Sequence, residues 1–295
     1  MELTGILLPI FNGLSQGVLL FLIASGLSLI FGVLGVLNFA HGGFFMLGAY
    51  FGFTVAQGRQ LPLIPFIAVV LGVGALVAVL GMITEVVLFR RIYNREEIYQ
   101  LLFTFALLLT IQGLTQQVYG LLPYSLPPPE ALTGAFFILG APLPQYFAFI
   151  IVVGLLVLIG LWLFLTRTTL GRLIHAVASD RWMASALGVN VSLVFTVVFG
   201  IGIFLAGVGG VLVAPTTAVS PSLAVLFIIQ AFAVIVIGGM DSVFGAFLAA
   251  ILLGLFNSFI VVQAQNLAQF TLYVGMILVL LLRPQGLLGT VRVRR

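Results

Sequence analysis

A short polar run interrupts an otherwise apolar stretch near the N-terminus. The run consists of Asn38, His41, Gly42 and Gly43. Amide and imidazole groups can hydrogen-bond a polar solute, and each glycine weakens a helix by up to about 1 kcal/mol relative to alanine. The adjacent glycines therefore predict a broken helix near residues 31–45. Backbone groups freed by a break in an apolar surrounding persist only beside protein or a cavity, so we expect these four residues to line a solute pathway.

Asn38 and His41 also admit a purely structural interpretation. A polar residue at a helix end can bond free backbone groups or contact a neighbouring helix, and most buried polar side chains are satisfied in this way. Residue types alone leave both interpretations open.

A second informative segment is the polar connection 167–190, RTTLGRLIHAVASDRWMASALGVN. It predicts an amphipathic helix of its own, with Ser179 or Asp180 as N-cap and Gly188 in the left-handed position that closes a helix. An uncovered apolar side of such a helix indicates either a partner protein or burial in the lipid interface, and composition leaves both open. The residues of that apolar side are Trp182, Met183, Ala186 and Leu187.

Residues suited to catalysis or metal binding are sparse. The sequence contains no Cys and no Lys, which excludes thiolate metal sites and the lysine of a phosphate-binding P-loop. No HExxH or GxSxG motif occurs, and the two histidines, His41 and His175, lie far apart in the sequence. We therefore predict no catalytic residue, no metal site and no enzymatic activity for this chain.

Two acidic residues lie close to the ends of apolar runs. Glu85 shortly precedes Arg90 and Arg91, so we expect it to pair with these arginines. Asp241 directly precedes an apolar run that begins at residue 243, where an N-cap role is the simplest interpretation. A self-sufficient channel or secondary transporter, the alternative function, usually carries ionisable groups well inside its spans.

Membrane helices are the elements that must position these residues. Of the 295 residues, 62% are hydrophobic and only 6% are charged, whereas a soluble domain carries about a quarter charged residues. The apolar runs are long and lack strand-like alternation, so we predict an all-α polytopic transmembrane bundle of eight to ten spans. The predicted spans are 6–31, 42–57, 61–89, 98–122, 145–166, 191–213, 223–239, 243–262 and 266–282.

Arginine-rich connections between the spans predict the orientation. Segments 90–97, 167–181 and 283–295 hold nearly all of the arginines, whereas 123–144 and 214–222 hold none. Because basic connections stay in the cytoplasm, we expect the first three segments, and with them the C-terminus, to be cytoplasmic. The net charge of +4 thus reflects topology and does not indicate nucleic-acid binding.

Residues 26–50 and 171–191 together resemble the permease subunits of branched-chain amino-acid ABC importers. The motifs are GLSLIFGVLGVLNFAHGGFFMLGAY and GRLIHAVASDRWMASALGVNV, and the ending LLRPQGLLG at 281–289 is similar to that family as well. The NFAHG form resembles the shorter of the two permeases that pair in these importers. The resemblance implies one transmembrane permease domain, 1–295, in the bacterial inner membrane.

The resemblance also implies a function and a set of partners. Such a permease translocates a small polar solute, with a branched-chain or other amino acid as the first expectation and an amide, urea or small organic acid as alternatives. A paired homologous permease, two cytoplasmic ATPase subunits and a soluble extracytoplasmic solute-binding protein would complete the importer. ATP and Mg would bind the ATPases, so no cofactor is expected on this chain.

The family's coupling loop falls on 167–190 of this sequence. Arg181 and Trp182 depart from the more usual residues of the pattern. The resemblance therefore implies that the ATPase docks on this loop without defining every contact. The positions that match the family pattern are Ala178, Asp180, Ala184 and Gly188.

Overall fold

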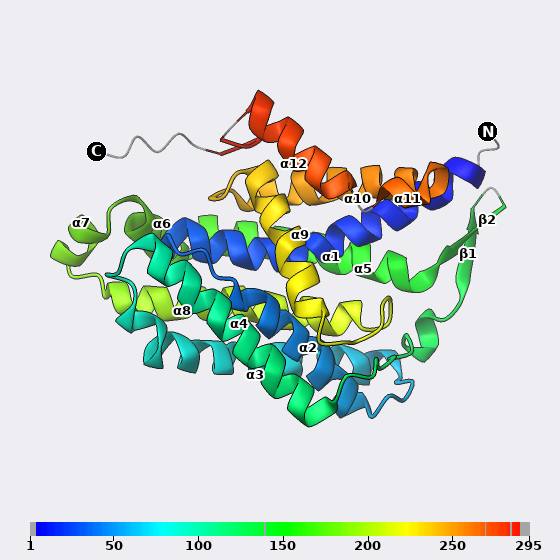
Figure 1. The fold of residues 1–295 in the computed structure, drawn as a ribbon, viewed down its shortest axis with the longest axis horizontal. Helices are drawn as coiled ribbons and strands as arrows, with labels where there is room; N and C mark the ends of the chain where they lie inside the picture. The colour runs from blue at the N-terminus through cyan, green and yellow to red at the C-terminus, as the bar shows by residue number, and fades with distance from the viewer. Residues whose placement is uncertain (1–3, 139, 269, 284, 290–295) are drawn as a thin grey trace.

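The computed structural model describes residues 4–138, 140–268, 270–283 and 285–289. Within these residues the regular elements are helices apart from one short hairpin, and the long helices form a bundle (Figure 1). Six helices are long and apolar enough to cross a membrane, and the other three predicted spans form shorter helices. The predicted all-α transmembrane bundle is confirmed.

Eight of the nine predicted spans each correspond to one helix whose ends differ from the prediction by a few residues, whereas the predicted span 266–282 is divided between Gln265–Ala268 and Thr271–Leu282. The segment expected to hold one amphipathic helix holds two, α6 and α7. The helices are α1 Thr4–Leu34, α2 Ala40–Ala56, α3 Leu63–Val87, α4 Glu97–Tyr119, α5 Gln145–Arg167, α6 Thr169–Ser179, α7 Arg181–Ala186, α8 Val191–Val213, α9 Leu223–Gly238, α10 Val243–Gln263, α11 Gln265–Ala268 and α12 Thr271–Leu282, with one-turn 3-10 helices η1 Phe89–Arg91 and η2 Glu130–Leu132.

Helix α1 lies at the centre of the bundle, against α8 and α10. Of its apolar stretch, 89% is buried, compared with 17% of α5. Close approach depends on small residues, because a Cβ added to Gly26 would collide with the carbonyl of Gly202 in α8. Membrane helices associate through such packing, since the lipid surrounding them is as apolar as their side chains. Helices α3, α4 and α5 expose many large apolar side chains and form the perimeter.

The two ends of the bundle differ. Helices α6 and α7 lie at one end, and the antiparallel hairpin of β1 Ala135–Ile138 and β2 Ala141–Pro144 lies at the other (Figure 1). At the hairpin end, the backbone of Tyr124 pairs with Val219 in an isolated bridge, over 2.9 and 2.8 Å. This bridge joins the segment after α4 to the connection between α8 and α9.

Candidate functional site

Helices α1 and α2 are separated by a non-helical segment, residues 35–39. Gly35 has a φ of 72° directly after the last residue of α1, a conformation that glycine adopts at little cost. The predicted break near residues 31–45 is confirmed, but its cause is not the adjacent glycines. Gly42 and Gly43 both lie inside α2.

The adjacent glycines serve helix packing. A Cβ added to Gly42 would collide with the carbonyl of Ala224 in α9 and would lie 2.7 Å from the Cβ of Ile228. A Cβ on Gly43 would lie 3.2 Å from the side chain of Ile111 in α4. The glycine pair therefore allows α2 to approach α9 and α4 closely, which outweighs its low helix propensity.

Neighbouring helices hold the break in place. The Thr104 hydroxyl of α4 donates to the Leu37 carbonyl over 3.1 Å. The Phe39 ring lies 4.6 Å from the Phe232 ring of α9 and meets the Phe105 ring of α4 edge-on at 6.0 Å. A change in the position of α4 or α9 would therefore displace the residues of the break.

Asn38 and His41 are both fully buried beside this break. The Nε2 atom of His41 bonds the carbonyl of Ile23 in α1 over 3.0 Å, as the structural interpretation expected. The His41 Nδ1 atom and both polar atoms of the Asn38 side chain have no hydrogen-bond partner among the described residues. A buried polar group left unpaired costs about 1–3 kcal/mol, so the Asn38 amide is available to a further partner.

Within the connection 167–190, helix α7 begins and ends with the predicted capping residues. The Oδ1 atom of Asp180 accepts hydrogen bonds from the amides of Trp182 and Met183, each over 2.9 Å. Gly188 has a φ of 84°. Thr168 additionally caps α6 by accepting a bond from the amide of Gly171 over 2.9 Å.

The four residues that match the family pattern lie on different sides of this loop. Ala184 is buried and Ala178 is half-buried, whereas Asp180 and Gly188 are exposed. The capping aspartate and the left-handed glycine fix the two ends of α7. The large apolar side chains exposed on α7 and at its C-cap, the α7 patch, are Trp182 (83% exposed), Met183 (55%) and Leu187 (78%).

Glu85 is the fully buried carboxylate at the end of α3 nearest α7. It accepts hydrogen bonds from the Tyr93 hydroxyl over 3.0 Å and from the Thr196 hydroxyl of α8 over 2.6 Å, and it pairs with the Arg90 Nε atom at 3.4 Å. The predicted pairing is confirmed for Arg90. Burial, followed by the Glu85 charge, raises the pKa of Tyr93 well above its usual range, so the hydroxyl stays a donor. This network fixes α3 to the first turns of α8.

The cap of α10 differs from the prediction. The Ser242 hydroxyl, not the Asp241 carboxylate, accepts the bond from the amide of Gly245, over 3.0 Å. Ser242 has the extended backbone conformation that an N-cap requires. Asp241 instead lies beside α1, with its Cα 3.6 Å from the place of a Cβ on Gly32.

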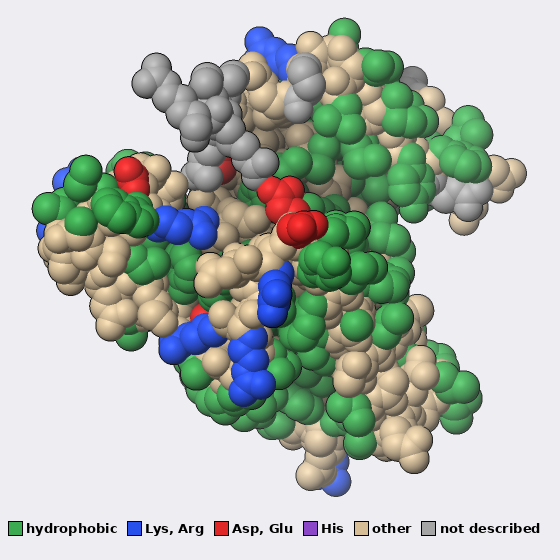
Figure 2. Space-filling view, turned by 60° about the vertical axis from the view of Figure 1, so that its left-hand side comes forward, with side chains coloured by type: hydrophobic (Ala, Val, Ile, Leu, Met, Phe, Trp, Pro, Cys, Tyr) green, Lys and Arg blue, Asp and Glu red, His purple; other side chains and the backbone are tan. Residues whose placement is uncertain are grey.

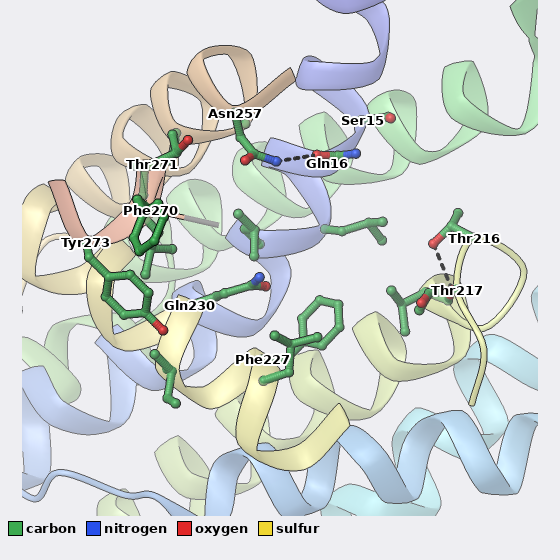
Figure 3. Close-up of a pocket in the computed structure, with 18 of the residues that line it drawn as sticks. Ser15, Gln16, Thr216, Thr217, Phe227, Gln230, Asn257, Phe270, Thr271 and Tyr273 are labelled. Carbon is green, nitrogen blue, oxygen red and sulfur yellow. Dashed lines mark hydrogen bonds between the residues drawn. The ribbon is translucent and has the colours of Figure 1, made fainter. Parts of the chain in front are cut away.

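A pocket of about 840 Å³ opens between α1, α9, α10 and α12, in the half of the bundle nearest the hairpin (Figure 3). No charged side chain is among its described lining residues. The Asn257 amide donates to Gln16 across it over 3.4 Å. Phe227 forms part of the wall, and its ring stacks at 4.5 Å on Phe45 of α2. Further polar lining residues are Ser15, Thr217, Gln230, Thr271 and Tyr273.

Comparison with known proteins shows to which family the chain belongs. The family described as "Branched-chain amino acid transport system / permease component" matches residues 9–282. The chain belongs to this permease family. As a member, it is a multi-pass membrane protein and the permease component of a transport system.

Individual relatives of this permease cover almost its whole length. The high-affinity branched-chain amino acid transport system permease protein BraD of Pseudomonas aeruginosa is 31% identical over 96% of both chains. The corresponding permease protein LivH of Escherichia coli K12 is 30% identical over 97% of this chain and 96% of its own length. The ribose import permease protein RbsC of Haemophilus influenzae is 27% identical over 50% of this chain and 44% of its own. No solved structure matches.

The structure brings some of the predicted residues of this permease together and separates others. Asn38 lies in the break and His41 lies next to it, in the first turn of α2. Gly42 and Gly43 instead face α9 and α4 as packing residues. The pocket was not predicted, because its polar residues come from four helices and from the connection between α8 and α9 and form no motif. Their only signal in the sequence is a scatter of amides, such as Gln230 and Asn257, within apolar runs.

Proposed function

We propose that this permease is one half of an ATP-driven importer for a branched-chain or other amino acid, with an amide, urea or small organic acid as alternative solutes. The observation that carries this proposal is the family match over 274 residues (282 − 9 + 1) together with relatives that transport branched-chain amino acids. Two ATPase subunits would hold ATP and Mg, and a paired permease and a soluble binding protein would complete the importer. The chain itself would be no enzyme.

The solute route would combine the pocket with the break between α1 and α2. Helix α9 connects them, because Phe227 lines the pocket and Phe232 contacts Phe39 at the break. The pocket offers amide and hydroxyl groups to a solute, and Asn38 offers an amide that has no protein partner among the described residues. Asn38, His41, Gly42 and Gly43 would thus border the inner part of the route, with the glycines shaping its wall.

The loop 167–190 would receive the ATPase through the α7 patch. An exposed Trp, Met and Leu on one short helix form an apolar surface next to charged residues, and central aromatic residues contribute most to protein interfaces. Ala178, Asp180, Ala184 and Gly188 would hold this helix in the shape that docking requires. The view of this end shows arginine side chains gathered around the loop (Figure 2), which suits an acidic partner surface.

The orientation follows from the same end of the molecule. Arg90, Arg91 and Arg95 lie in the same end region as α6 and α7, and basic residues stay in the cytoplasm. We therefore place α6 and α7 inside the cell, the hairpin outside, and the C-terminus in the cytoplasm. Of the arginines in the predicted segment 283–295, Arg283 follows the last residue of α12, and Arg292, Arg294 and Arg295 lie outside the described residues.

Transport assays in proteoliposomes test this proposal. The permease assembled with its paired permease, the ATPases and the binding protein should take up radiolabelled leucine only with ATP. The permease reconstituted alone should give no uptake. Uptake by the chain alone, without ATP, would contradict the importer and support a self-sufficient channel or secondary transporter.

A further inference from the structure

The side chain of Arg181, the first residue of α7, turns back toward the break. Its Nη2 atom donates to the carbonyl of Leu34 over 3.4 Å and lies 3.7 Å from the place of a Cβ on Gly35. Leu34 is the last residue of α1. Carbonyls at a helix C-terminus lack intrahelical donors and carry partial negative charge, so a guanidinium there is favourable.

The same guanidinium also contacts α8. It lies 5.7 Å from the centre of the Phe195 ring, within the range of a cation–π interaction. Phe195 is buried and meets the Tyr93 ring edge-on at 5.4 Å. Because Tyr93 and Thr196 both donate to the buried Glu85 carboxylate, this side of Arg181 rests on the fixed α3–α8 frame.

Arg181 therefore bridges a fixed part of the permease and the point where α1 stops being helical. Beyond that point the chain continues as the non-helical segment 35–39. This segment includes Asn38, whose side chain has no hydrogen-bond partner among the described residues. On its other flank, α1 is held by the Ser28 hydroxyl, which donates to the Met240 carbonyl over 3.2 Å. A displacement of α7 against α8 would pull on Leu34 and shift the break.

The geometry points to Arg181 as the positioning residue that transmits movement of α7 to the break between α1 and α2. This inference rests on the proposed function, because it requires the ATPase to move α7. Arg181 acts through Leu34 and Gly35 and does not itself touch the solute. Lysine would replace it only in part, because an ammonium can bond the carbonyl but lacks the planar guanidinium that stacks on Phe195.

The test compares Arg181→Ala and Arg181→Lys with Arg172→Ala in the complete reconstituted complex. Arg172 is a matched control, since it is an exposed arginine of the same loop whose guanidinium bonds Thr169 of its own helix. We expect Arg181→Ala to lower leucine uptake per ATP hydrolysed by about tenfold, within the usual range of coupling between sites, with hydrolysis continuing. For Arg181→Lys, leucine uptake per ATP hydrolysed should lie between the values of Arg181→Ala and the wild type. For Arg172→Ala it should equal the wild-type value.

A thiol probe reads out the movement itself. The chain has no Cys, so Leu37→Cys provides a single reactive site at the break. Its alkylation rate should change when ATP and vanadate are added, and this change should vanish in the Arg181→Ala background while it persists with Arg172→Ala.

The outcomes separate this inference from the proposed function. Unchanged uptake per ATP in Arg181→Ala, or an ATP-dependent alkylation change that persists, would overturn the role of Arg181. A proportional loss of uptake, hydrolysis and complex yield would assign it a merely structural role and overturn the inference as well. Unchanged binding of the ATPase by Trp182→Ala would instead remove the proposed docking surface, a part of the proposed function.

Discussion

Two buried polar side chains of this permease have opposite surroundings. Glu85 is fully satisfied, with bonds to Tyr93, Thr196 and Arg90. Asn38 is equally buried, yet its amide has no bond among the described residues. A paired buried carboxylate stabilises the arrangement it sits in, because removing a partner leaves an uncompensated charge. An unpaired amide lowers stability and is retained for another reason, which we take to be the solute.

Asn38→Leu should separate function from stability. Leucine has the same branched arrangement of heavy atoms as asparagine and removes the unpaired amide, so thermal stability in detergent should stay equal or rise, by about 1 kcal/mol. Leucine uptake by the reconstituted complex should nevertheless be lost, while co-purification with the ATPases stays intact. His41→Leu removes one paired bond and should lose both uptake and about 1 kcal/mol of stability. Full uptake by Asn38→Leu would return both residues to a structural role.

At the scale of elements, helix positions could be predicted from the sequence and helix faces could not. The lengths of the apolar runs predicted where the spans lie. The arginines of the loop 167–190, together with Asp180 and Gly188, predicted the position of that loop. Membrane helices are apolar on all sides, so periodicity does not reveal which side faces protein. For this reason Gly42 and Gly43 were taken for a break although they are packing residues, and the four-helix pocket remained hidden.

Substitution of the packing glycines tests this interpretation. Gly42→Leu should prevent α2 from approaching α9 and cost about 3 kcal/mol through overpacking. The control is Gly113→Leu in α4, where an added Cβ meets nothing within 4 Å. The temperature of thermal unfolding and the yield of folded protein should fall for Gly42→Leu and stay unchanged for Gly113→Leu. Equal stability of both variants would contradict the packing role.

The α7 patch predicts a specific loss of ATPase binding. Trp182→Ala, combined with Leu187→Ala, should reduce co-purification of the ATPase by about tenfold or more, because aromatic anchors dominate interfaces. The chain has one other tryptophan, Trp162 of α5, which is 56% exposed on the perimeter. Trp162→Ala should leave co-purification unchanged. Equal effects of the two tryptophans would indicate that α7 lies in lipid instead.

At the scale of the whole molecule, the opposite ends of the bundle are predicted to face opposite sides of the membrane, α6 and α7 the cytoplasm and the hairpin the outside. Thr133 follows η2 near the hairpin, and Ser185 lies in α7; both are exposed. Because the chain has no Cys, Thr133→Cys and Ser185→Cys each provide one thiol. A membrane-impermeant maleimide added to intact cells should label residue 133 only, and residue 185 only after permeabilisation. The reverse pattern would invert the orientation without changing the fold.

The central place of α1 has a consequence for biosynthesis. This helix leaves the ribosome before the other described helices, yet the helices that surround it include α8, which begins at Val191, and α10, which begins at Val243. At a synthesis rate of about 5–20 residues per second, α1 spends on the order of ten seconds in the bilayer without these neighbours. Its largely apolar surface makes that interval tolerable, because lipid serves as a temporary partner. The same surface means that a nascent chain stopped before α8 leaves its future core helix in lipid, an unfinished protein that membrane quality control can recognise.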